Sequence, residues 1–153
     1  MNAEQRLAAA GAFWKEDQSD IEMQHAEAIL TIARRLNFRV KSVQALPIEK
    51  RTRLLAQLGD VSDAVATRAL ISYHFNTKRE LMAAFLDALG ITHDNGLINE
   101  ETVAAPDRAK LEAGIKQLRA SFSQSDVDLY LRTLSVLDGD TWAELESAMA
   151  AQA

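Results

Sequence analysis

Hydrophobic residues recur along most of the chain with the period of an α-helix. In residues 81–89, for example, Leu81, Phe85 and Leu89 fall on one side of a helix with a repeat of about 3.6 residues. Similar stretches lie between residues that favour helix starts and helix ends. We predict helices near residues 3–16, 19–36, 47–58, 61–75, 78–89, 106–122 and 125–137, with a short last one at 142–150.

The helix predicted at 61–75 differs from the others because apolar residues cover most of its circumference. A helix that is apolar nearly all round is buried on several sides. We find no convincing strand pattern. The sequence therefore predicts an all-α, single-domain bundle of about seven helices, with a buried central helix near 61–75.

The length of 153 residues fits one helical domain, 1–153. Within it, residues 1–40 are expected either to pack on the bundle of residues 47–150 as an N-terminal helical hairpin or to extend from it. With 48% hydrophobic and 25% charged residues, the composition is typical of a soluble globular protein. No apolar run is long enough to span a bilayer, so we expect a cytoplasmic protein that does not enter membranes.

Charge is spread unevenly along the chain, which has a net charge of −5. Residues 1–40 carry a net charge of −1, residues 41–80 of +3 and residues 81–153 of −7. An excess of three bases is small beside the basic faces that bind phosphates. Nucleic acid is therefore not the expected partner, since the acidic C-terminal part repels it.

One short motif lies in the basic segment. The stretch YHFNTKREL, residues 73–81, resembles the end of the recognition helix and the following corner in TetR-family repressors. The resemblance implies phosphate contacts for Thr67 and Lys78 and a groove contact for Arg68. His74 and Arg79 are further candidates for contact with nucleic acid in the same segment.

The same stretch also fits two packed helices joined at a corner. Val65 and Ser72 stand where the repressor family has a glycine and a tyrosine, and the match is confined to residues 61–80. We therefore expect a structural corner, with a DNA-binding transcriptional regulator that uses a TetR-like helix–turn–helix at 61–80 as the alternative.

Residues that would mark an enzyme or a metal protein are missing. The chain contains no nucleophile elbow, P-loop or dinucleotide fingerprint. The absence of cysteine excludes thiolate ligands, and the three histidines have no metal-ligand spacing. We predict no catalytic residues, no metal and no cofactor.

Phe13 and Trp14 form the largest apolar pair near a chain end. They are expected either to pack their helix onto its own bundle or to contact another chain. The preferred hypothesis is a non-enzymatic protein that acts through protein–protein contact, with either another protein or a second copy in a homodimer.

Overall fold

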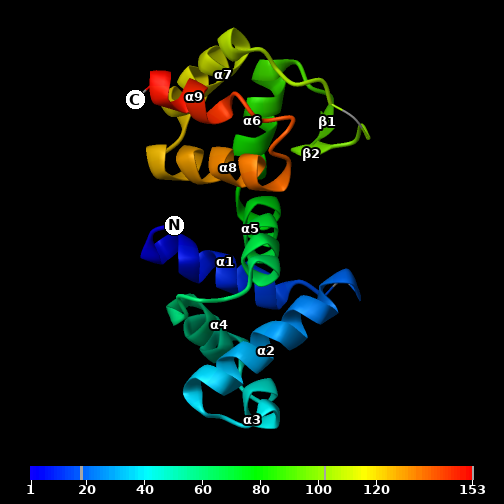
Figure 1. Ribbon diagram of the computed structural model, residues 1–153, viewed down its shortest axis with the longest axis vertical. Helices are drawn as coiled ribbons and strands as arrows, with labels where there is room; N and C mark the ends of the chain where they lie inside the picture. The colour runs from blue at the N-terminus through cyan, green and yellow to red at the C-terminus, as the bar shows by residue number, and fades with distance from the viewer. Residues whose placement is uncertain (18, 102, 153) are drawn as a thin grey trace. The chain divides into compact units, whose positions relative to one another are not determined.

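The computed structural model describes residues 1–17, 19–101 and 103–152 and confirms an all-α protein. Over these residues the structure has nine α-helices rather than about seven: residues 37–46 contain a short helix that was not predicted, and the short last helix predicted at 142–150 spans Leu145–Ala151. A short 3-10 helix and one pair of two-residue strands complete the fold (Figure 1). The α-helices are α1 (Ala3–Lys15), α2 (Glu22–Leu36), α3 (Val40–Gln44), α4 (Ile48–Gln57), α5 (Asp63–Thr77), α6 (Arg79–Leu89), α7 (Arg108–Ser121), α8 (Gln124–Leu137) and α9 (Leu145–Ala151).

The helices form two compact units. Unit 1 comprises residues Met1–Asn76 and unit 2 comprises Thr77–Ala153. The boundary falls inside the motif that resembles the repressor corner, where Lys78 is the single residue between α5 and α6. The motif is therefore the connection between the two units.

In unit 1, α4 packs along α1 and also contacts α2. A capping box starts α1, in which the Asn2 side chain accepts from the Gln5 amide at 2.8 Å and the Gln5 side chain accepts from the Asn2 amide at 3.0 Å. The buried face of α1 carries alanines followed by Phe13 and Trp14. The small residues before these rings let α4 approach α1 closely. Residues 1–40 therefore pack in the same unit as α4.

The turn after α2 is an ordered helix end. Asn37 adopts the left-handed conformation, with φ of 55°, and the Phe38 amide donates to the Ala33 carbonyl at 2.9 Å. This arrangement satisfies carbonyls that a helix end would otherwise leave free. It directs the chain into α3, whose Val43 is buried in unit 1.

Helix α5 has few exposed positions, as its apolar composition predicted. Val65, Ala69, Ser72, Tyr73 and His74 are buried. Most of its other residues are half-buried, and only the two ends of the helix are exposed.

In unit 2, α7 packs against α6, α8 and α9. Gly114 lets α7 approach α6, since a Cβ at this position would lie 3.4 Å from Phe85 Cε1. The core of the unit contains Phe85, Tyr130 and Trp142, all at most 4% exposed. The tight packing around Phe85 identifies it as the centre of this core.

The two strands, β1 (His93–Asp94) and β2 (Leu97–Ile98), pair antiparallel across a two-residue turn. Asn95 and Gly96 both have positive φ, 47° and 90°, as a type I′ turn requires. The dipeptide Asn95-Gly96 is typical of this type of turn. Glycine is also needed there for space, because a Cβ would lie 2.8 Å from Met82 Cβ.

Candidate functional site

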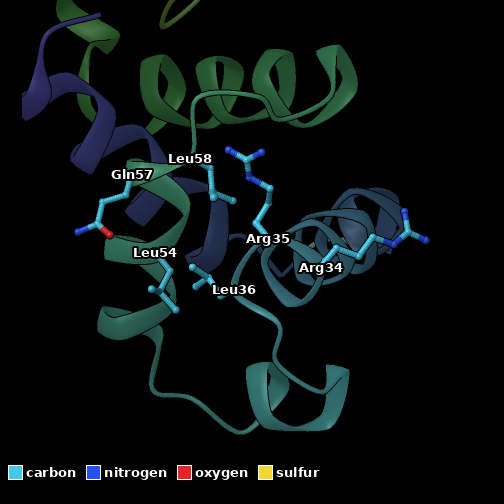
Figure 2. A pocket seen from close by; sticks show the side chains of 6 residues that line it. All are labelled: Arg34, Arg35, Leu36, Leu54, Gln57 and Leu58. Atoms are coloured by element: carbon cyan, nitrogen blue, oxygen red, sulfur yellow. The ribbon is translucent and has the colours of Figure 1, made fainter.

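A groove with an apolar floor lies between the C-terminal parts of α2 and α4 in unit 1. Its volume is about 420 Å³. Figure 2 shows Leu36, Leu54 and Leu58 converging between the two helices, while Arg35 extends alongside them. Arg34 and Gln57 point outward on opposite sides of the groove. The groove therefore combines leucine side chains with two guanidinium groups.

A second groove, of about 310 Å³, lies between α1 and α4. It is formed by small and apolar side chains together with two arginines, and its lining residues are Ala3, Arg6, Leu7, Arg53, Ala56 and Gln57. Gln57 lines both grooves, so they meet over the C-terminal half of α4. We call the residues that line the two grooves the α4 surface.

The α4 surface is basic. Among its described residues are four arginines and no carboxylate: Arg6, Arg34, Arg35 and Arg53. It belongs to a basic stretch of the sequence, since residues 34–53 contain seven bases and one acid. This charge attracts anionic groups to a surface that also offers leucines for burial.

One of the four arginines is held in an exposed ion pair. Arg35 Nη1 lies 3.2 Å from Asp60 Oδ2, and both side chains are more than half exposed. An ion pair in water contributes about 0–1 kcal/mol, so a carboxylate from a partner can replace Asp60 at little cost. Arg35 is therefore only weakly held in this ion pair.

Apolar side chains are also exposed on the chain around α3. Phe38 is 48% exposed, and Val40 and Ile48 are exposed as well. The ordered end of α2 fixes the backbone at Phe38, so its ring projects from a defined position. The exposed apolar area of unit 1 thus continues beyond the two grooves.

Phe13 and Trp14 lie inside unit 1, at 0% and 5% exposure. Their rings contact His25, whose Nε2 lies 2.6 Å from the Phe13 carbonyl oxygen. The guanidinium carbon of Arg51 lies 4.9 Å from the centre of the Trp14 ring, in a cation–π contact. Of the two arrangements left open by the sequence, the structure has the one in which α1 packs on its own unit.

Arg68 and Thr67, two of the candidate nucleic-acid contacts, lie on α5. Arg68 Nη2 donates to Glu16 Oε1, and Arg68 Nη1 lies 3.3 Å from Asp20 Oδ2. The Ser72 hydroxyl donates to the other oxygen of Glu16. Arg68 is only 19% exposed and Thr67 is half-buried. The charge of Arg68 is therefore balanced within unit 1.

The remaining candidates for contact with nucleic acid also have partners within the protein. His74 is buried, and its Nδ1 lies 2.8 Å from the Leu70 carbonyl oxygen. In unit 2, Lys78 Nζ lies 2.9 Å from Asp126 Oδ2, and Arg79 Nη1 donates to the Asn95 carbonyl at 3.0 Å. Arg68, Lys78 and Arg79 each have a partner within their own unit, so the DNA-binding hypothesis gains no support from these contacts.

Ionisable groups in unit 2 show two shifts in pKa. Burial raises the pKa of the Tyr130 hydroxyl above its ordinary value of 10.0. The Thr141 hydroxyl and amide donate to Asp138 and lower the pKa of that exposed carboxyl. Among the described residues, no three His, Cys, Asp or Glu side chains lie close enough together to hold a metal ion.

The α4 surface was not predicted from the sequence. Its residues come from α1, α2 and α4, so their proximity depends on the packing of unit 1. The excess of bases over residues 34–53 was a usable signal, but it was missed because counting residues 1–40 and 41–80 separately divides it.

No helix in the described part of the chain is long and apolar enough to cross a membrane. The chain matches no protein-family model, no curated protein and no solved structure.

Proposed function

We propose that this protein acts without catalysis, by binding a protein partner at the α4 surface. The observation that supports this function is the union of two leucine-containing grooves with four arginines over one helix. Arginine is enriched at protein interfaces because its guanidinium group makes several hydrogen bonds while its stem covers apolar surface. A cytoplasmic location is part of the same proposal.

Several exposed leucines favour a protein partner over nucleic acid. Leu7 and Leu36 are 46% and 37% exposed. Phosphate groups are recognised by cations and hydrogen-bond donors and gain nothing from leucine. A protein segment with apolar and acidic side chains satisfies both components of the surface.

The arrangement of the grooves favours a macromolecule over a small ligand. Sites for small molecules enclose most of the ligand surface. Here the two grooves meet at Gln57, and rim residues such as Arg53 remain exposed. An extended partner segment covers both grooves at once, which a compact ligand does not.

Affinity capture from extract tests the proposal. Tagged wild type is compared with a Leu7→Asp/Leu36→Asp variant, which places a carboxylate in each groove. A matched variant, Met23→Asp/Leu30→Asp, makes the same changes at two exposed residues of α2 that do not line the grooves. We expect the wild type and the matched variant to retain the same protein after nuclease treatment, and the groove variant to lose it.

An untagged copy of the same chain is included in the extract so that self-association is detected as well. If the groove variant retains every protein that the wild type retains, the α4 surface is not the binding site. If nuclease removes all bound material, the partner is a nucleic acid and the regulator hypothesis replaces this one.

A further inference from the structure

We propose that the partner of the α4 surface is a second copy of this chain, which contributes its own residues 136–146. This inference rests on the proposed function and identifies the chemistry of the partner. Charge complementarity supports it, because the chain contains both a basic surface with leucines and an acidic segment with exposed apolar side chains.

The acidic segment lies in unit 2, where α8 ends and α9 begins. Val136 and Leu137 are 65% and 47% exposed at the end of α8. Four exposed carboxylates follow within the next nine residues: Asp138, Asp140, Glu144 and Glu146. No lysine or arginine occurs after residue 132. We call residues 136–146 the acidic turn.

The acidic turn has a defined shape in its first half. Asp138 accepts hydrogen bonds from the Thr141 amide at 3.1 Å and from the Thr141 hydroxyl at 2.6 Å. These bonds lower the pKa of Asp138, so its carboxyl is ionised at neutral pH. The turn therefore presents negative charge beside two apolar side chains in an ordered conformation.

The two regions complement each other in both charge and polarity. Arg34 and Arg53 provide cations on either side of α4, and Leu36 and Leu7 provide apolar contacts. The acidic turn offers carboxylates together with Val136 and Leu137. Complementary charges increase association rates and select the partner, while buried apolar side chains contribute binding free energy.

The distribution of charge between the units favours this pairing of unlike surfaces. Residues 1–76 contain ten bases and nine acids, whereas residues 77–153 contain seven bases and thirteen acids. A net charge of −5 per chain repels copies that approach at random. Attraction between copies requires the basic surface of one to face the acidic turn of the other.

A two-fold symmetric dimer uses both the α4 surface and the acidic turn of each copy. In a symmetric dimer, each copy contributes one α4 surface and one acidic turn, so two equivalent contacts form. The second contact forms within an encounter already made, which strengthens the dimer beyond one contact alone. The expected assembly is therefore a dimer.

Sedimentation of the purified full chain tests the inference. We expect a monomer–dimer equilibrium over about 1–200 µM, in the range of modest interfaces, that weakens as salt rises from about 50 to 500 mM. Arg34→Glu/Arg53→Glu reverses one arginine in each groove and should weaken dimerisation at least about tenfold. Arg39→Glu/Lys41→Glu makes the same change in net charge outside the grooves and should weaken it much less.

A charge swap identifies the partner segment. Asp140→Lys/Glu144→Lys alters the acidic turn but preserves Asp138, which holds the turn through Thr141. We expect this variant and Arg34→Glu/Arg53→Glu each to be monomeric alone. Mixed together, they should form a heterodimer, because one contact keeps the native charges and the other places the introduced glutamates opposite the introduced lysines. Circular dichroism checks that each variant remains helical.

Three results would overturn the inference. The first is a wild type that stays monomeric at every concentration in low salt. The second is a dimer whose stability does not depend on either charge reversal. The third is a pair of variants that fails to associate on mixing. If the wild type is monomeric but extract capture still depends on Leu7 and Leu36, the partner is a different protein and the proposed function stands.

Discussion

Both units bury aromatic rings, but they differ in the charge that surrounds their exposed apolar side chains. In unit 2 the ring centres of Phe85 and Tyr130 are 5.9 Å apart, and those of Phe85 and Trp142 are 6.0 Å apart, all inside the core. In unit 1 a partly buried cluster joins Glu16 to Arg68, while leucines and arginines remain on the α4 surface. Unit 1 thus exposes leucines beside arginines, whereas unit 2 exposes Val136 and Leu137 beside the carboxylates of the acidic turn.

The largest expected effect tests the core of unit 2. Phe85→Ala should lower its free energy of unfolding by about 3–5 kcal/mol, because the fully buried ring leaves a cavity that its neighbours cannot fill. Urea unfolding followed by Trp142 fluorescence, in a Trp14→Phe background, measures this change in unit 2. Phe38→Ala in unit 1 is the matched control, followed by Trp14 fluorescence in a Trp142→Phe background, and should change stability by less than about 0.5 kcal/mol. Equal effects at the two phenylalanines would contradict the assigned core.

The next effect tests the polar cluster of unit 1. Arg68→Ala removes the guanidinium group that pairs with the Glu16 carboxylate, to which the Ser72 hydroxyl still donates. Both side chains of the ion pair are less than one fifth exposed. We expect a loss of about 2–3 kcal/mol, below the range for fully buried pairs because some solvent reaches the site. Trp14 fluorescence in a Trp142→Phe background reports the unfolding of unit 1.

Arg35→Ala provides the control, because its ion pair with Asp60 is more than half exposed. This substitution should cost less than about 1 kcal/mol. A loss at Arg35 equal to that at Arg68 would show that the polar cluster has no special role in unit 1.

The helical fold was predictable because it depends on local sequence patterns. The stripe of Leu81, Phe85 and Leu89 and the turn at Asn95–Gly96 both appear where the sequence indicates them. Helix caps were harder to locate. Thr77 and Glu80 have the spacing of a capping box, but the residue before α6 is Lys78, which makes no side-chain cap bond. Several residues near a helix end have suitable side chains, and tertiary packing decides which one caps.

The candidate site was less predictable because it depends on long-range packing. Phe13 and Trp14 were candidates for contact with another chain, but their exposure is decided by how α1 packs against α4. Arg68 was a candidate for nucleic-acid contact, and its pairing with Glu16 spans 52 residues. The amino-acid sequence identifies which side chains are capable of binding, but not which side chains of the same chain they contact after folding.

The third prediction concerns Tyr130 in the core of unit 2, which should make the free energy of unfolding depend on pH. Burial raises the pKa of Tyr130 in the folded protein, so the folded state retains its proton when the unfolded state loses it above pH 10.0. The free energy of unfolding is therefore unaffected by this group below that pH. It falls as the pH rises further, by up to about 1.4 kcal/mol per pH unit. Tyr130→Phe should reduce the slope of unfolding free energy against pH. An unchanged slope would mean that Tyr130 does not cause it.

The smallest effect tests whether the α4 surface serves binding rather than folding. Leu7→Asp and Leu36→Asp change side chains that are 46% and 37% exposed in the monomer. Each should alter the free energy of unfolding of unit 1 by less than about 0.5 kcal/mol, as is usual for exposed positions. The measurement is made in high salt at low protein concentration, where the proposed dimer is dissociated and association does not add to stability. A loss above about 2 kcal/mol would mean that these leucines support the fold and that the α4 surface is not kept for binding. Unchanged stability together with lost association would assign the leucines to the interface.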